Sequence, residues 1–320
     1  MNKINILITG ISSSNSITFI KGLRKQTDIQ FIISGTDVYE ECYSPGASFC
    51  DNFYKIPYAS ENSFVLVLLK ICKENSIDVL VPIIDEEFLP ISKFRDDFEK
   101  LNTKVMLPKH EVLSICRNKV KTYDFLKHIG VPVPDIYLSI SDINNFPVIK
   151  KPVIGRGSKG INIILNKKKL KVSGNNKEYF YQKYVEGTEF TVDTLSDLNG
   201  NVLKVVSRVR LEVKDGKSIK GQIVKNKDIE DTVSKICTKL GLTGPACVQC
   251  ILNSDNIPYF FDINPRIGSA TILTIQAGMN IPFLAVKNIL GLKVDMSLNK
   301  INENTIMLRY WNEVFTSVEE

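Results

Sequence analysis

Two short apolar segments near the C-terminus carry side chains that could bind a metal ion. Residues 246–252 and 258–265 are each typical of a β-strand, and the residues between them have turn composition. Because side chains alternate along a strand, Asp262 and Asn264 should emerge on the same face. If the turn is centred on residues 255–256, Gln249 falls opposite Asp262 on the neighbouring strand. The pattern predicts a cluster of one carboxylate and two amide oxygens.

Oxygen ligands of this kind suit Mg²⁺, which keeps water and substrate phosphates in its remaining coordination positions. Arg266 follows two residues later and could bind a transferring phosphoryl group or a carboxylate through two hydrogen bonds. The alternative is an ordinary amphipathic hairpin whose polar residues face solvent. The flanking Phe260, Phe261 and Ile263 make a surface position less favourable.

A glycine-rich loop lies far upstream of this hairpin, at residues 155–160, with the pattern G-x-G-x-x-G. Residues 148–152 before it and 161–164 after it are rich in β-branched side chains, so the loop should join two strands. Such a loop could close over phosphates with its backbone N–H groups, or it could be a simple flexible hairpin. Lys151, directly before the loop, would add a positive charge for phosphates. The candidate loop residues are Gly155, Gly157, Ser158 and Gly160.

Two better-known nucleotide sites do not fit these patterns. A dinucleotide motif must open a helix, whereas this glycine loop joins strands, and the turn at 10–15 lacks the second and third glycines. A protein kinase has its lysine after the glycine loop and carries an H-R-D sequence. Here the lysine comes first, and neither His110 nor His128 lies in such a sequence.

The N-terminal third has the pattern of a parallel α/β domain. Expected strands at residues 4–8, 31–33, 77–84 and 105–107 alternate with expected helices at 17–23, 64–72 and 88–101. Ligands of such sheets bind at the carboxyl ends of the strands, here residues 10–15, Asp37 and 85–87. Asp85, Glu86 or Glu87 could face a substrate, or the three acids could simply begin a helix.

Residues 113–129 show apolar positions at steps of three or four and are predicted to form one helix, stopped by Gly130 and the prolines that follow. Lys119 lies off its apolar stripe. Taken alone, it would be a surface lysine.

The composition is that of an ordinary globular protein of two or three domains, with 320 residues, 43% hydrophobic and 24% charged. A net charge of +6 is a mild excess and does not indicate nucleic-acid binding. Seven irregularly spaced cysteines favour a reducing compartment. No apolar run is long enough for a membrane span or a signal-peptide core, so we expect a cytoplasmic protein with no membrane contact.

Taken together and in order, these motifs resemble ATP-grasp enzymes, and in particular single-copy relatives of the carbamoyl-phosphate synthase large subunit. The resemblance covers nearly the whole chain and rests on residues 118–121, 148–160, 181–190 and 261–266, behind the α/β domain. It implies an N-terminal parallel α/β pre-ATP-grasp domain followed by an ATP-grasp domain made of two α+β subdomains. The implied bounds are 1–109, then 110–180 for a small lid subdomain with the flap, and 181–320 for a C-terminal subdomain with the metal site.

The resemblance also implies roles for individual residues. Lys119 and Lys151 would contact ATP phosphates, with Lys151 also near adenine, and Glu189 would hold the ribose hydroxyls. Gln249, Asp262 and Asn264 would bind Mg²⁺, and Arg266 would steady an acyl phosphate. Arg208 and Arg210 would contact phosphate or substrate. The adenine hinge would be Gln182, Lys183, Tyr184 and Val185, through backbone groups of Lys183 and Val185.

The implied reaction uses ATP and two Mg²⁺ ions, with Mn²⁺ as a substitute, to phosphorylate a carboxylate. An amine or similar nucleophile then attacks the acyl phosphate. The alternatives are phosphorylation of bicarbonate or carbamate, and a non-catalytic ATP-binding module. Many relatives have Glu where Gln249 and Asp262 stand, and this chain has one copy of the module and no glutaminase-like portion. The expected partners are small carboxylate and amine substrates, and a homodimer is the default assembly.

Overall fold

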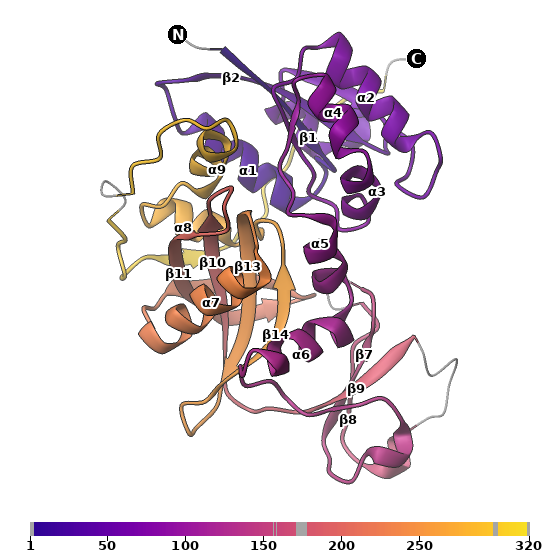
Figure 1. Cartoon of the computed structure of the whole chain (residues 1–320), viewed down its shortest axis with the longest axis vertical. Helices are drawn as coiled ribbons and strands as arrows, with labels where there is room; N and C mark the ends of the chain where they lie inside the picture. The colour runs from indigo at the N-terminus through magenta and orange to yellow at the C-terminus, as the bar shows by residue number, and fades with distance from the viewer. Residues whose placement is uncertain (1–2, 156, 158, 171–177, 297–299, 319–320) are drawn as a thin grey trace.

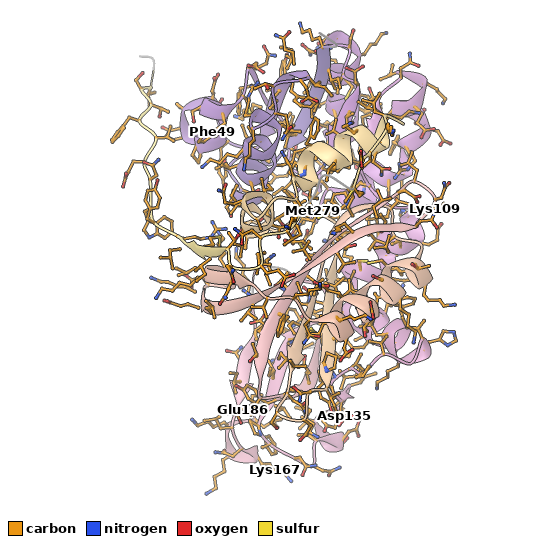
Figure 2. All side chains as sticks on the ribbon, turned by 90° about the vertical axis from the view of Figure 1, so that its left-hand side faces the viewer. Phe49, Lys109, Asp135, Lys167, Glu186 and Met279 are labelled. Carbon is orange, nitrogen blue, oxygen red and sulfur yellow. The ribbon has the colours of Figure 1, made fainter. Side chains whose placement is uncertain are left out.

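The computed structural model describes residues 3–155, 157, 159–170, 178–296 and 300–318. Three sheets organise these described residues, as Figure 1 shows from top to bottom. The N-terminal parallel sheet lies at one end, a six-stranded sheet occupies the middle, and a four-stranded sheet lies at the other end. In Figure 2, Asp135, Lys167 and Glu186 mark this last end of the molecule, and Phe49 lies toward the opposite one. No helix of the described residues is long and apolar enough to cross a membrane.

The N-terminal sheet is parallel, in the order β3-β2-β1-β4-β5, which confirms the predicted α/β domain. Its helices cover both faces with apolar side chains. The elements are β1 (Lys3–Thr9), α1 (Ser14–Arg24), β2 (Gln30–Asp37), the 3₁₀ turns η1 (Glu41–Tyr43) and η2 (Pro45–Phe49), β3 (Asn52–Lys55), α2 (Phe64–Glu74), β4 (Val79–Val81), α3 (Phe88–Lys93), α4 (Arg95–Lys100) and β5 (Lys104–Val105).

The helix predicted at 88–101 is broken in two at Phe94, so the prediction of one continuous helix was wrong. After this break, Arg95 donates hydrogen bonds to the backbone carbonyls of Val105, Leu107 and Pro108. The contact ties α4 to the end of β5. It depends on residues ten or more positions away and left no signal in the local periodicity.

The helix predicted at 113–129 is also two helices, α5 (His110–Arg117) and α6 (Lys119–His128). Asn118 separates them in an extended conformation, and its side-chain oxygen accepts a hydrogen bond from the Lys121 N–H. Asparagine is a favoured N-cap residue, which accounts for the break. As a result Lys119 begins a helix, and its N–H donates to the Val153 carbonyl at 2.9 Å.

The four-stranded sheet has the order β6-β9-β7-β8 and contains β6 (Ile136–Tyr137), β7 (Val148–Pro152), β8 (Asn162–Ile164) and β9 (Tyr179–Lys183), with the 3₁₀ turns η3 (Ile140–Asp142) and η4 (Lys167–Lys169) beside it. Antiparallel β7 and β8 flank the glycine loop, so the loop joins two strands as predicted. The predicted subdomain boundary after residue 180 falls within β9.

The six-stranded sheet has the order β14-β13-β10-β11-β12-β15. Its members are β10 (Thr188–Ser196), β11 (Val202–Lys214), β12 (Lys217–Ile223), β13 (Gly244–Leu252), β14 (Pro258–Asn264) and β15 (Ile306–Leu308). Helix α7 (Lys227–Leu240) packs its apolar side on one face, where Val192, Val248 and Phe260 are buried. Polar residues are therefore left to the other face.

The C-terminal helices α8 (Thr271–Gln276) and α9 (Ile281–Ile289) connect this sheet to the N-terminal domain. Phe283 of α9 meets Phe31 edge-on at 6.2 Å between ring centroids. Gly22 of α1 lies so close to Pro282 that an added Cβ would be 2.7 Å from its ring. One buried apolar cluster therefore runs from β1, β2 and α1 into α8 and α9, which fixes the carboxyl ends of the N-terminal strands against the six-stranded sheet.

Candidate active site

The face of the six-stranded sheet opposite α7 carries the three predicted metal ligands and Arg208. Gln249 of β13 pairs with Asp262 of β14 on one side and with Thr191 of β10 on the other. Thr191 in turn pairs with Arg208 of β11. Residues paired directly across neighbouring strands share a face. The register predicted for the hairpin is thus confirmed, and Asn256, with a φ of +59°, lies in its turn.

Asp262 is the centre of the cluster. One carboxylate oxygen accepts a hydrogen bond from Lys119 Nζ at 2.8 Å, and the other accepts one from Asn264 Nδ2 at 2.8 Å. Burial acts to raise the pKa of Asp262, but the charge and hydrogen bond of Lys119 outweigh it, so the pKa lies below its ordinary value. Asp262 is therefore an anion held by a lysine 143 positions away.

Lys151 lies deeper, with only 7% of its surface exposed. Its Nζ donates to Gln182 Oε1 at 2.5 Å and lies 4.7 Å from the centre of the Phe261 ring. Burial, followed by the charge of Lys119, lowers the pKa of Lys151 to about 8. Two lysines thus converge beside a single carboxylate, an arrangement that leaves positive charge for a polyphosphate.

Gln182 is fully buried, and its side chain orients Lys151. Its Oε1 also accepts a hydrogen bond from the Tyr123 hydroxyl at 2.6 Å. Among the other residues predicted to form the adenine hinge, the Lys183 N–H donates to the Asp135 carbonyl at 2.8 Å and the Tyr184 N–H donates to the Pro147 carbonyl at 3.1 Å. Val185 follows in the link to β10.

The glycine loop between β7 and β8 requires glycine at two of the described positions. Gly157 and Gly160 have φ values of +61° and +75°, a region that other residues adopt at a cost. Gly155 lines the pocket that also contains Lys119 and Asp262. Ser158 lies outside the described residues.

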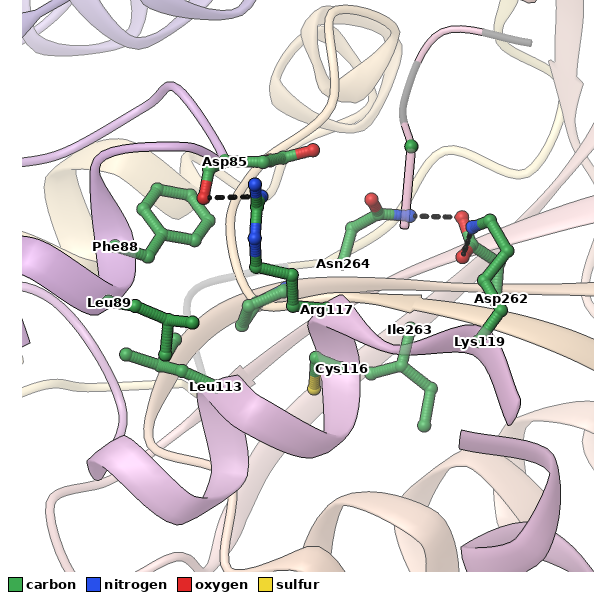
Figure 3. A pocket seen from close by; sticks show the side chains of 12 residues that line it. Asp85, Phe88, Leu89, Leu113, Cys116, Arg117, Lys119, Asp262, Ile263 and Asn264 are labelled. Atoms are coloured by element: carbon green, nitrogen blue, oxygen red, sulfur yellow. Dashed lines mark hydrogen bonds and ion pairs between the residues drawn. The ribbon is translucent and has the colours of Figure 1, made fainter. Parts of the chain in front are cut away.

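Arg266 extends from the end of β14 to the N-terminal domain. Its Nε donates to Asp85 Oδ1 at 2.9 Å, and its Nη2 lies 3.3 Å from Asn264 Oδ1. The backbone carbonyl of Asp85 accepts a hydrogen bond from Arg117 at 2.9 Å, as Figure 3 shows beside the Asn264–Asp262–Lys119 contacts. Asp85 thus faces the site. Helix α3 begins three residues later, at Phe88.

The other two acids of that stretch differ from Asp85. Glu87 is buried and accepts a hydrogen bond from the Thr9 hydroxyl, and burial raises its pKa to about 8. This hydrogen bond connects the end of β1 to the loop that follows β4. Glu86 precedes it and makes contacts of its own.

Arg208 and Arg210 are both held in intramolecular ion pairs. Arg208 donates to Asp193 through Nε at 3.0 Å and Nη2 at 3.2 Å, and both side chains are almost fully buried. Arg210 pairs with Glu189 and donates to the Gly216 carbonyl at 2.7 Å. The ribose role of Glu189 and the phosphate roles of the two arginines stay predictions.

Two residues of the site, Tyr123 and Arg117, were not predicted. Tyr123 looked like part of an apolar helical stripe, although a buried tyrosine usually needs a hydrogen-bond partner for its hydroxyl. Nothing in the sequence around Arg117 indicated a role in the site, apart from its proximity to Lys119. Asp85 was noted at a strand end, but its arginine partner is 181 positions away.

The oxygen donors fit a metal ion shared with a nucleotide better than a metal ion bound by protein alone. Among the described residues no group of three or more His, Cys, Asp or Glu side chains comes together. Asp262 supplies one carboxylate, and Asn264 and Gln249 can supply amide oxygens. Mg²⁺ in nucleotide sites is held by few protein groups, with phosphates and water completing its coordination. The residues present are compatible with that ion.

Comparison with known proteins agrees with this geometry. A family model described as an ATP-grasp domain matches residues 116–270, and one described as a PylC-like N-terminal domain matches residues 6–106. The chain is 23% identical over 297 residues to the carbamoyl phosphate synthase large chain of Pseudothermotoga lettingae, covering 85% of this chain and 25% of that one. It is 28% identical over 167 residues to the D-alanine–D-alanine ligase of Fusobacterium nucleatum subsp. nucleatum, covering 48% and 58%.

Among solved structures, a biotin carboxylase–β,γ-ATP complex from Campylobacter jejuni superposes with a TM-score of 0.74 at 16% identity, covering 94% of this chain and 74% of that chain. This shows a shared fold. The chain spans a quarter of the carbamoyl phosphate synthase chain and 58% of the D-alanine–D-alanine ligase.

The chain therefore contains an ATP-grasp domain, and the ATP-grasp resemblance inferred from its motifs is confirmed. This domain follows a PylC-like N-terminal domain, and the sequence relatives named above are a carbamoyl phosphate synthase large chain and a D-alanine–D-alanine ligase.

Proposed function

We propose that this protein is an ATP-dependent ligase that phosphorylates a small-molecule carboxylate and transfers the acyl group to an amine or similar nucleophile, releasing ADP and phosphate. The observation that carries the proposal is the convergence of Lys119, Lys151, Asp262 and Asn264, with Arg266 at its edge. The site thus combines lysines that could bind phosphates, oxygen ligands that could bind a metal ion, and an arginine that could bind the reacting acyl group. Gly155 brings the glycine flap to the same pocket.

In this proposal Asp262, Asn264 and Gln249 would hold Mg²⁺, which supplies charge neutralisation for the phosphates of ATP. Lys119 is hydrogen-bonded to Asp262 in this structure. When the nucleotide binds, the Lys119 ammonium group would turn toward the phosphates. Lys151 is already oriented by Gln182. Because phosphoryl transfer needs mainly positioning and charge compensation, these residues account for most of what the protein must provide.

Arg266 would bind the carboxylate during phosphorylation and then the acyl phosphate, because its guanidinium can donate two parallel hydrogen bonds to either group. The flap, closing over the site, would keep water from hydrolysing the acyl phosphate. The amine would then attack the acyl carbon, with phosphate as the leaving group. The described residues offer no group that we assign as a general base.

A panel of carboxylic acids, amino acids included, tests the proposal through ADP release with and without added amines. We expect one acid to stimulate ADP release and ¹⁸O from its carboxylate to appear in phosphate. Asp262→Ala should abolish the stimulated release, whereas Asp255→Ala, in the exposed turn of the same hairpin, should retain it. If an acid stimulates turnover but none of its carboxylate oxygen appears in the released phosphate, the acyl phosphate intermediate is contradicted.

The second candidate is phosphorylation of bicarbonate or carbamate. It is favoured by the carbamoyl phosphate synthase relative, whose alignment covers 85% of this chain. ADP release that depends on bicarbonate and needs no organic acid would support it over the carboxylate–amine ligase.

A further inference from the structure

Arg309 is a half-buried arginine that neither the motifs nor the site described above include. It follows β15, the last strand of the six-stranded sheet. Its Nε donates to the Ser218 carbonyl at 2.9 Å and its Nη2 donates to the Ser269 carbonyl at 2.6 Å. Its backbone N–H also bonds to the Ile219 carbonyl. The guanidinium is therefore fixed in place by neutral acceptors.

The position of Ser269 connects Arg309 to the active site. Residues 267–270 form the loop between Arg266 and α8, and they begin three residues after Asn264. A Cβ added at Gly268 would lie 3.4 Å from Cys247 Sγ and 3.5 Å from Arg208 Nη2. Cys247 is the β13 partner of Asn264. The loop that Arg309 contacts thus lies over the same strand pair that presents the predicted metal ligands.

Three arginines surround this loop, and their charges are not equally compensated. Arg266 is paired with Asp85 and Arg208 with Asp193. Arg309 has no carboxylate partner among the residues that the structure describes. Burial, and then the positive charge of Arg208, lowers the pKa of Arg309. A partly desolvated cation beside another cation is unfavourable unless an anion joins it.

We propose that Arg309, together with the loop at Gly268 and Ser269, binds a carboxylate group of the small-molecule substrate and so helps to select that substrate. The inference rests on the proposed ligase function and adds a specificity-determining residue to it. A carboxylate fits because Arg309 spends two of its hydrogen-bonding positions on carbonyls and keeps others for a planar anion. Because Arg266 and Arg208 are already paired with carboxylates, the charge of Arg309 would assist Arg266 in attracting the incoming carboxylate.

Arg95 provides a matched control, because it too is a partly buried arginine that donates only to backbone carbonyls, here those of Val105, Leu107 and Pro108. Burial likewise lowers its pKa. It belongs to the N-terminal domain and is remote from the loop at 267–270. Arg309→Gln and Arg95→Gln therefore both remove side-chain hydrogen bonds to backbone carbonyls, two at Arg309 and three at Arg95, but only the first removes the proposed site.

The test measures two kinds of binding to the full-length protein. Calorimetry with MgADP tests the proposed function in the wild type and in each variant. Thermal shift, with and without MgADP, then tests acetate and the twenty proteinogenic L-amino acids, each against its neutral amide at equal ionic strength. We expect at least one carboxylate, and not its amide, to stabilise the wild type and Arg95→Gln.

In Arg309→Gln we expect the affinity for that carboxylate to fall roughly 10- to 100-fold, with MgADP affinity unchanged. The carboxylate affinity of Arg309→Lys should lie between those of the wild type and Arg309→Gln, because lysine keeps the positive charge but lacks the planar guanidinium that binds a carboxylate through two hydrogen bonds. Equal carboxylate affinity in the wild type and Arg309→Gln, or no response of the wild type to any carboxylate, would overturn the inference. Absence of MgADP binding in the wild type would instead overturn the proposed function.

Discussion

The buried Lys151 should make the nucleotide-free protein less stable than it could be, and replacing it with Met tests this. A pKa lowered from 10.5 to about 8 means that the folded protein disfavours the charged lysine. Each pKa unit corresponds to about 1.4 kcal/mol, so the charged form costs about 3 kcal/mol at pH 7. Lys151→Met also loses the hydrogen bond to Gln182, which lowers the stability of the variant by about 1 kcal/mol. We therefore expect Lys151→Met to be about 2 kcal/mol more stable than the wild type.

The pH dependence follows from the direction of the shift. Between pH 8 and 10.5 the unfolded chain keeps a proton on this lysine that the folded protein has lost, so wild-type stability rises with pH across that window. The extra stability of Lys151→Met over the wild type should be greatest below pH 8 and should decrease steadily toward pH 10.5. The same variant should bind MgADP or MgATP at least about 10-fold more weakly, because a charge-assisted contact to phosphate is lost.

Thermal unfolding of both proteins between pH 7 and 10.5, together with calorimetric nucleotide binding at pH 7, measures these effects. Lys183→Met serves as the control, since this lysine is on the neighbouring strand β9 of the same sheet and its side chain is 54% exposed. It should change stability by less than about 0.5 kcal/mol at any of these pH values. A Lys151→Met protein that melts below the wild type at pH 7, or whose difference from it does not depend on pH, would refute the reasoning.

Three further variants test contacts around the site. Asp85→Asn should lower turnover roughly 10-fold while leaving MgADP affinity unchanged, because Asp85 orients Arg266 and not the nucleotide; a steady-state assay with unchanged turnover would contradict this. Tyr123→Phe should lower stability by about 1 kcal/mol in thermal unfolding through loss of its hydrogen bond to Gln182, and equal melting temperatures would show that this bond contributes nothing. Asp193→Asn should cost about 3–5 kcal/mol, because it leaves Arg208 buried without its counter-charge, and near-wild-type stability in urea would argue against a strong pair.

The β13–β14 hairpin could be predicted in detail because its signals are local. Alternating apolar residues and turn composition between 246 and 265 sufficed to place Gln249 opposite Asp262. The parallel N-terminal sheet and the strand–loop–strand setting of the glycine flap were equally readable from short-range patterns.

Contacts between distant segments could not be predicted in this way. Nothing near Asp262 in the sequence indicates that Lys119 binds it, and nothing near Asp85 indicates Arg266. The resemblance implied that Arg208 contacts phosphate or substrate, but nothing in the sequence indicated that its guanidinium turns onto Asp193. Periodicity also hid the helix break at Asn118, although its residue type is that of an N-cap.

The most direct test of the central claim is calorimetric titration of ADP with and without Mg²⁺ into the wild type, Asp262→Ala and Asp255→Ala. If Asp262 anchors a metal–nucleotide beside Lys119 and Lys151, Mg²⁺ should strengthen ADP binding to the wild type and to Asp255→Ala, and this gain should disappear in Asp262→Ala. An Asp262→Ala protein that binds MgADP with the affinity and Mg²⁺ dependence of the wild type would contradict the account.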